Sequence, residues 1–253
     1  MSRVGLKRRL QAKETVIGTF ARIPNAELIE IEAHAGFDFV VIDTEHTAFG
    51  METAIDLARA ADAAGIAPLV RVTENSPSLI AKALDIGSQG VVVPRIETRE
   101  EAERAVQAAR FHPLGHRGAC PRVRAGDYSA MDAVEYFTRA NERTLLILLV
   151  ETARGAVNLK EIVSTPGVDA ILLGATDLSQ SLGVPGQNDH PTVLAKLAEM
   201  TATIAGAGLA LARVAFTVEE ARSHFQQGAQ MLIYSGDETI YYQACRQAVA
   251  ALS

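Results

Sequence analysis

The sequence of 253 residues has no tryptophan, and aromatic residues make up only 5% of it. It has no run of about 18 apolar residues, the length that a membrane-spanning helix requires. Its first fifteen residues hold no apolar stretch long enough for a signal peptide. Hydrophobic residues at 48% and charged residues at 21% are typical of a globular protein. We therefore expect a soluble, cytoplasmic protein without a membrane partner.

Cysteine and positive charge are also scarce. The two cysteines, Cys120 and Cys245, lie far apart and form no Cys-x-x-Cys motif, so neither a zinc site nor a disulfide framework is indicated. The net charge of -6 argues against a nucleic-acid partner, because affinity for phosphate backbones depends largely on clustered Lys and Arg. The basic cluster 7–9 is too short to change this, and we expect it to be a solvated face of the first helix.

Lysine is rare, and its positions exclude one mechanism. An enzyme that works through a Schiff base needs a desolvated lysine, which in a barrel fold faces the interior of the barrel. All lysines fall in predicted helices or in the N-terminal segment: Lys7, Lys13, Lys82, Lys160 and Lys196. The sequence therefore argues against Schiff-base chemistry and leaves a metal ion as the candidate for activating a carbonyl group.

Apolar, β-branched runs alternate with amphipathic segments along the whole chain. A run that is apolar throughout is typical of a strand buried on both faces, as in a parallel sheet covered by helices. We expect eight such strands, at residues 16–22, 37–43, 68–72, 90–96, 145–151, 169–174, 209–214 and 230–234. Strict strand–helix alternation over eight units predicts an α/β fold, a (β/α)8 TIM barrel that forms one domain over residues 1–253. An open doubly wound sheet is the alternative.

Two segments do not fit the simple repeat. More than thirty residues separate the helix that ends near Arg110 from the strand at Leu145, and a connection of this length usually carries function or structure of its own. We expect a short helix over residues 132–139 within it. Residues 238–251 form an amphipathic helix that either closes the barrel or packs on another subunit.

Polar side chains gather at the predicted ends of the strands, where the loops of a barrel surround one pocket. These residues are Asp43, Glu45, His46, Arg71, Arg95, Glu151 and Asp177. Glu151 and Asp177 follow two of the most apolar strands, and two carboxylates completed by water suit Mg²⁺, Mn²⁺ or Co²⁺. Each residue also has a structural explanation, because acidic residues after strands cap helices and an arginine can simply pair with a neighbouring carboxylate.

Several motifs together resemble the HpcH/HpaI family of metal-dependent pyruvate aldolases. They are FDFVVIDTEHTAFG, the VRV segment with Arg71, LIAKALDIGSQGVVVPRIET, PLGHRG, VETARGAVNLKEI and GATDLSQSLGVPG, in that order. The resemblance implies a TIM barrel that reversibly cleaves 4-hydroxy-2-oxoacids, such as dihydroxyheptenedioate or 2-keto-3-deoxy sugar acids, into pyruvate and an aldehyde. It also implies a homohexamer in which the last helix is exchanged between subunits.

The same resemblance implies roles for individual residues. Glu151 and Asp177 correspond to the family's metal ligands, and His46 to its acid/base, with Asp43 orienting it or sharing its proton through water. Arg71 corresponds to the arginine that holds the pyruvyl oxygen. The amides of Gly174, Ala175 and Thr176 would receive the substrate carboxylate, and Asp85 resembles a carboxylate that reaches the site of an adjoining subunit.

Two positions depart from the family pattern. Leu149 stands where the family often has Gln, and Ala175 stands where it often has Pro. Neither is a proposed metal ligand, but Leu149 removes a polar contact near the substrate. Two rival functions therefore stay open. One is a malyl-CoA or citramalyl-CoA lyase of the citrate lyase β-subunit type, although no basic CoA groove is evident. The other is a non-catalytic barrel that binds an oxoacid.

Overall fold

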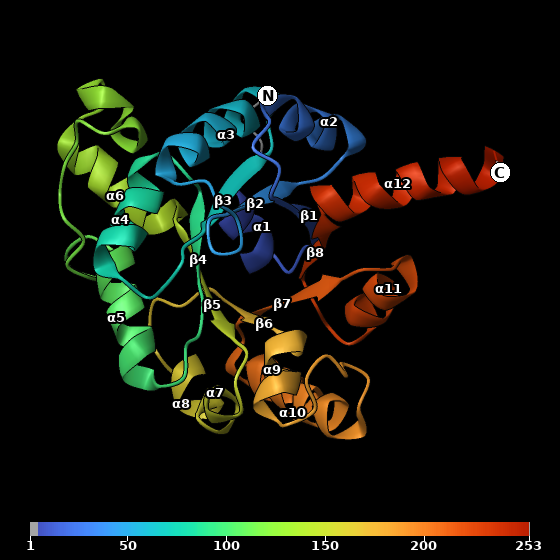
Figure 1. The fold of residues 1–253 in the computed structure, drawn as a ribbon. Helices are drawn as coiled ribbons and strands as arrows, with labels where there is room; N and C mark the ends of the chain where they lie inside the picture. The colour runs from blue at the N-terminus through green and yellow to red at the C-terminus, as the bar shows by residue number, and fades with distance from the viewer. Residues whose placement is uncertain (1–4, 253) are drawn as a thin grey trace.

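The barrel predicted from the sequence is present and closed. The computed structural model describes residues 5–252 and contains eight parallel strands that pair in sequence order, with β1 also pairing with β8. The (β/α)8 prediction is confirmed, and the open doubly wound alternative is wrong (Figure 1). The predicted domain also includes residues 1–4 and 253, which lie outside the described part of the chain; its extent stays a prediction.

Every predicted strand has a counterpart in the barrel. The observed strands are β1 (Val16–Ala21), β2 (Phe39–Asp43), β3 (Ala67–Arg71), β4 (Gly90–Val93), β5 (Leu145–Val150), β6 (Ala170–Leu173), β7 (Ala210–Ala215) and β8 (Met231–Gly236). The helices are α1 (Leu6–Gln11), α2 (Ala26–Ala35), α3 (Met51–Ala64), α4 (Pro77–Asp85), α5 (Arg99–Ala109), α6 (Ala133–Arg143), α7 (Ala153–Val157), α8 (Leu159–Val163), α9 (Ala175–Ser181), α10 (Pro191–Ala207), α11 (Val218–Gln226) and α12 (Asp237–Leu252), with a 3-10 helix η1 (Arg124–Ser129) before α6.

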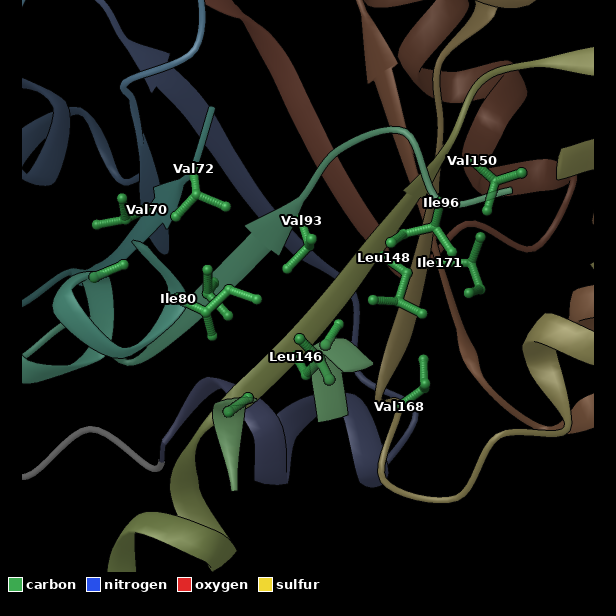
Figure 2. Packing of buried hydrophobic residues seen from close by; sticks show 14 of the residues in the cluster. Val70, Val72, Ile80, Val93, Ile96, Leu146, Leu148, Val150, Val168 and Ile171 are labelled. Carbon is green, nitrogen blue, oxygen red and sulfur yellow. The ribbon is translucent and has the colours of Figure 1, made fainter. Parts of the chain in front are cut away.

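The strands are apolar throughout because each buries side chains on two sides. Successive side chains of a strand point to opposite faces. On β5, Leu146 and Leu148 belong to the cluster that packs the barrel wall against the helices, whereas Leu145, Ile147 and Leu149 belong to the cluster inside the barrel. Figure 2 shows part of the outer cluster, where side chains of β3 to β6 lie with Ile80 from α4.

Helix α1 closes the N-terminal end of the barrel. Leu6 and Leu10 are buried and join the cluster inside the barrel. The neighbouring Lys7 is largely buried too, and its ammonium group forms a 2.8 Å ion pair with Asp169 at the start of β6. The expectation that the whole basic cluster 7–9 is solvated is therefore wrong for Lys7, because the amphipathic pattern places its aliphatic stem against the barrel.

The long connection between α5 and β5 contains structure of its own. It holds η1 and α6, and α6 is longer than the predicted helix 132–139. Asp132 caps α6 by accepting hydrogen bonds from the backbone N–H groups of Val134 and Glu135. The segment thus folds back over the N-terminal end of the barrel.

Helix α12 does not close the barrel. It leaves β8 and extends away from the rest of the chain (Figure 1), and every residue from Tyr241 to Leu252 is exposed. Of the two expected positions for the last helix, closure of its own barrel is wrong. Within residues 5–252, none of the helices combines the length and the apolar character that crossing a membrane would require.

Phe39 provides a direct test of the barrel interior. It is fully buried on β2, and its ring occupies the space that a side chain at Gly18 of β1 would need. We expect Phe39→Ala to lower the free energy of unfolding by about 3–5 kcal/mol, because it leaves a cavity. Urea titration followed by circular dichroism measures this. Ile31→Ala, at an exposed position of α2, should change it by less than about 0.5 kcal/mol; equal losses in the two variants would contradict the packing described.

Candidate active site

Strand alternation brings the polar side chains of several strand ends together. Asp43 and Arg71 continue the inward-facing series of β2 and β3 that includes Val41 and Leu69, and they are register partners. Glu151 continues the inward series of β5 two residues beyond Leu149. These three side chains therefore form a polar layer at the carboxyl ends of the strands, above an apolar barrel interior. This is the end of the barrel at which TIM-barrel enzymes carry out their chemistry.

Asp43 is the anion that holds the arginines of this layer. Its carboxylate accepts hydrogen bonds from Arg71 Nε at 2.9 Å and Nη2 at 2.5 Å, and from Arg22 Nε at 2.9 Å. Although burial acts to raise the pKa of Asp43, the hydrogen bonds and charges of Arg71 and Arg22 lower it to about 2. Asp43 is thus a permanent anion near neutral pH, which favours the orienting role over the proton-sharing role.

The loop after β2 places Glu45 and His46 beside this pair. The backbone N–H groups of both residues donate to Asp43 Oδ1, so Asp43 also fixes the start of the loop. Glu45 Oε2 lies 3.3 Å from Arg71 Nη1 and 3.7 Å from His46 Nε2. Burial raises the pKa of Glu45, while Arg71 acts to lower it. His46, by contrast, has a side chain that is 53% exposed, so it can exchange protons with solvent.

Glu151 is a buried carboxylate with little positive charge near it. It is 6% exposed, and Oε1 accepts a 3.1 Å hydrogen bond from the backbone N–H of Arg95. Burial is the main cause that raises the pKa of Glu151 to about 7, and the negative charges of Asp177 and Glu45 add to it. A Cβ atom at Gly174 would lie 2.7 Å from Glu151 Oε2. Glycine is therefore needed where β6 passes this carboxylate.

This arrangement fits a divalent cation. Glu151 and Asp177 act on each other electrostatically, and Glu45 Oε2 is buried without a hydrogen-bond partner among the described residues. A cation would relieve the cost of burying the Glu151 charge, since Asp177 is exposed and Glu45 Oε2 already lies 3.3 Å from Arg71 Nη1. Within residues 5–252, no group of three or more His, Cys, Asp or Glu side chains is placed to enclose an ion. Water or substrate would have to supply the remaining ligands of such an ion, as is usual for Mg²⁺.

Leu149 and Ala175, the two departures from the family pattern, lie beside this carboxylate. Leu149 is 2% exposed in the barrel interior, and its Cδ1 would lie 3.2 Å from a Cβ at Gly174. Ala175 is the first residue of α9, and both Thr176 and Asp177 are exposed in its first turn. Leu149 therefore makes the floor of the site apolar beneath Glu151.

Asp85 is the one predicted site residue that the fold keeps away from the others. It ends α4 and precedes β4, so it lies at the N-terminal end of the barrel. There it accepts a 2.6 Å hydrogen bond from Arg117. Asp85 cannot serve the site of its own chain, and its role in an adjoining subunit stays a prediction.

Arg22 is a site residue that the sequence reasoning did not single out. It joins Asp43 to Glu238, whose Oε1 lies 2.9 Å from Arg22 Nη1, and Phe20 lies beneath both arginines with its ring centre 4.7 Å from each guanidinium carbon. Arg22, His46, Phe49 and Glu238 also line a cavity of about 740 Å³ outside the polar layer. Arg22 ends the first predicted strand with the same parity as Phe20, so strand alternation was the signal available for it.

An eight-stranded parallel barrel with this layer of carboxylates and arginines at the ends of its strands defines a TIM-barrel enzyme. The chain belongs to the HpcH/HpaI aldolase/citrate lyase family, which its residues 16–244 match. It is an aldolase, a carbon–carbon lyase, of that family.

Two curated relatives act on sugar acids. The 2-dehydro-3,6-dideoxy-6-sulfogluconate aldolase of Pseudomonas putida is 32% identical over 243 residues, which are 96% of this chain and 94% of the relative. The 5-keto-4-deoxy-D-glucarate aldolase of Escherichia coli is 32% identical over 241 residues, which are 95% of this chain and 93% of the relative.

Two solved structures show the same barrel. An HpcH/HpaI aldolase/citrate lyase family protein from Burkholderia cenocepacia is 34% identical with a TM-score of 0.93, and the match covers 98% of each chain. The citrate synthase SbnG is also 34% identical, with a TM-score of 0.89, and the match covers 98% of this chain and 97% of the other. The fold and family expected from the motifs are confirmed.

The buried charge of Glu151 should make stability depend on pH. The pKa of Glu151 is raised from 4.5 to about 7 in the folded chain, so between these values the unfolded chain has lost the proton that the folded chain still holds. The contribution of Glu151 to stability is therefore greatest below pH 4.5 and is lost as the pH rises to about 7. In chelator, Glu151→Gln should be more stable than the parent at pH 8 by up to about 3 kcal/mol, and the gain should vanish near pH 4.

Urea titrations at the two pH values measure the difference. Glu142→Gln, at an exposed position of α6, is the matched control and should show no pH-dependent gain. A gain for Glu151→Gln that is the same at both pH values would contradict the burial argument.

Proposed function

We propose that this aldolase uses a divalent cation to cleave 4-hydroxy-2-oxoacids reversibly into pyruvate and an aldehyde. The observation that carries the proposal is the buried Glu151 carboxylate beside Asp177, with Arg71 fixed two strands away by Asp43. The absence of a lysine from every described strand supports the same chemistry, since a Schiff base would need one.

Glu151 and Asp177 would hold the cation. Mg²⁺, Mn²⁺ and Co²⁺ all accept two carboxylates together with oxygen ligands from water and substrate. Such an ion supplies a Lewis acid that polarises the 2-oxo group of the substrate. The amides of Ala175 and Thr176 would receive the substrate carboxylate, because the first N–H groups of a helix have no acceptor within the helix. Gly174, the third residue expected in this role, uses its own N–H to donate a 3.3 Å hydrogen bond to the Val150 carbonyl.

Arg71 stabilises the charge that cleavage creates. When the bond between C3 and C4 breaks, its electrons leave an enolate whose negative charge develops on the former oxo oxygen. The two hydrogen bonds from Arg71 to Asp43 hold the guanidinium in one orientation, so little reorganisation is needed as this charge forms. Preorganised donors of this kind are worth about 10²- to 10³-fold in rate.

His46 and Glu45 manage the proton. Cleavage requires a base that removes the proton of the 4-hydroxyl group. His46 borders the cavity of about 740 Å³ outside the polar layer, called the mouth cavity below, where the aldehyde half of the substrate would lie. Glu45, 3.7 Å from His46 Nε2, stabilises the imidazolium that forms. Asp43 anchors the backbone of the same loop and keeps its own charge, so it orients the base without taking the proton.

The substrates named for two relatives suggest the class of substrate. Both are deoxy oxo sugar acids whose far end carries a second anionic group, a sulfonate in one and a carboxylate in the other. The mouth cavity of about 740 Å³ has room for the aldehyde half of such a molecule. We extend the proposal to 2-oxo-3-deoxy sugar acids as the substrates to test first.

Assembly is part of the proposal. The exposed α12 supports exchange of this helix between subunits, because a helix with Tyr241, Tyr242 and Leu252 exposed gains stability when a second chain covers it. A homohexamer built in this way would also allow Asp85 of one subunit to approach the site of another.

Metal dependence can be tested without knowing the aldehyde. Protein treated with a chelator should not exchange the methyl protons of pyruvate for deuterium, and added Mn²⁺ should restore the exchange, which proton NMR follows. Glu151→Gln and Asp177→Asn should lose Mn²⁺ binding, whereas Asp189→Asn, at an exposed loop position, should keep it. Exchange in the presence of chelator, or a covalent imine trapped by borohydride, would refute the proposal.

Cleavage should depend on the fixed orientation of the Arg71 guanidinium as well as on its positive charge. Arg71→Ala should lower kcat/KM for cleavage about 10³-fold, and Arg71→Lys should recover little, since lysine cannot form the paired bonds to Asp43. Arg222→Ala, at an exposed position of α11, is the control and should leave kcat/KM unchanged. Steady-state assays of pyruvate release measure these values. Full activity in Arg71→Lys would show that its fixed orientation has no role.

A further inference from the structure

A second cavity lies at the end of the barrel opposite the active site. It has a volume of about 450 Å³ and lies between α1, the turn before β4, and the segment from η1 to the end of α6. Lys7 and Arg8 line it from α1, Arg139 and Arg143 from α6, and Arg117 from the long connection. This volume lies within the range of small-molecule sites.

The charge of this cavity is opposite to that of the whole chain. Among the described residues, five cationic side chains line it and Asp127 is the only acidic one, although the chain carries a net charge of -6. Three of the cations have acidic partners: Lys7 pairs with Asp169, Arg117 with Asp85 and Arg139 with Glu135. The side chains of Arg8 and Arg143 have no ion-pair or hydrogen-bond partner among residues 5–252. Two positive charges at this cavity are therefore unbalanced.

The wall behind these charges is built and buried. The Arg117 side chain is 2% exposed, packs 4.6 Å from the centre of the Phe111 ring, and donates through Nη2 to Asp85 and, at 3.3 Å, to the Tyr136 hydroxyl. Its Nε is buried and has no acceptor in the described part of the chain. The charge of this guanidinium is therefore only partly compensated, and it contributes positive potential to the cavity that it lines.

The environment of Lys7 also indicates an excess of positive charge at this cavity. Burial lowers the pKa of Lys7, and the charge of Arg110 lowers it further, although Asp169 acts to raise it. The positive groups at this end of the barrel thus repel one another, and an anion would reduce that repulsion. Guanidinium groups with free donors match the oxygens of phosphates and carboxylates.

We propose that this cavity binds a small, multiply charged oxyanion, carried on a phosphate ester or a polycarboxylate. Arg8 and Arg143 supply the unpaired charges at its rim, and the buried guanidinium of Arg117 adds positive charge to its wall. Within one chain, the site is separate from the catalytic layer, because the barrel interior lies between them. Binding here should therefore be independent of Arg71 and of the divalent cation.

Titration calorimetry on the full chain in chelator and low salt tests this, with glucose 6-phosphate and tricarballylate as probes. We expect at least one probe to bind, and the pair of results identifies which oxyanion the site prefers. The double variant Arg8→Gln and Arg143→Gln should weaken binding at least about tenfold, as expected for the loss of two charged donors. Arg104→Gln, at an exposed position of α5 outside the cavity, should bind like the parent.

A gain of affinity provides a second test that misfolding cannot imitate. Asp127→Asn removes the one acidic lining residue and should tighten binding several-fold. Arg71→Ala should bind the probe as the parent does, which keeps this test independent of the catalytic proposal. The proposal is overturned if neither probe binds at millimolar concentration, if the double variant binds as well as the parent, or if Arg71→Ala abolishes binding.

Discussion

The site depends on a carboxylate that the barrel buries without a neutralising partner. Glu151 is 6% exposed and receives one backbone hydrogen bond, while Asp177 and Glu45 add negative charge around it. The charge of Arg71 offsets this only in part, because its Nε and Nη2 donate to Asp43 and its Nη1 lies beside Glu45. A buried charge in this position destabilises the fold unless a cation joins it. The same cost would favour binding of the divalent ion that we propose.

The two ends of the barrel carry charge of opposite sign. At the carboxyl ends of the strands, Asp43 holds two arginines in place. Glu151 and Asp177, beyond these arginines, form a region of negative charge. At the opposite end, α1 and α6 bring cations together without enough carboxylates to balance them. The apolar interior of the barrel separates the two regions, so each can bind a ligand of opposite sign.

Sequence patterns predicted the fold, and they also indicated that several polar residues meet at one end of the barrel, because both features depend on strand alternation. Runs such as LLILLVE indicate strands buried on both faces, and the parity of each strand places Asp43, Arg71 and Glu151 in one layer. Loop conformation does not follow from periodicity, so the sequence could not show that Asp43 binds the arginines while Glu45 faces His46. The link from Arg22 to Glu238 requires β8 to close on β1, a long-range pairing.

Contacts between subunits cannot be predicted from the pattern of a single chain. The pattern of residues 238–251 predicts an amphipathic helix but does not say which chain covers its apolar face, and α12 extends away from its own barrel.

The most direct test of the central claim is a crystal structure with Mn²⁺ and pyruvate, using anomalous scattering to locate the metal. We predict a single strong peak between the carboxylates of Glu151 and Asp177, with pyruvate completing the coordination. A peak elsewhere, or pyruvate bound in this layer without a metal, would contradict the account.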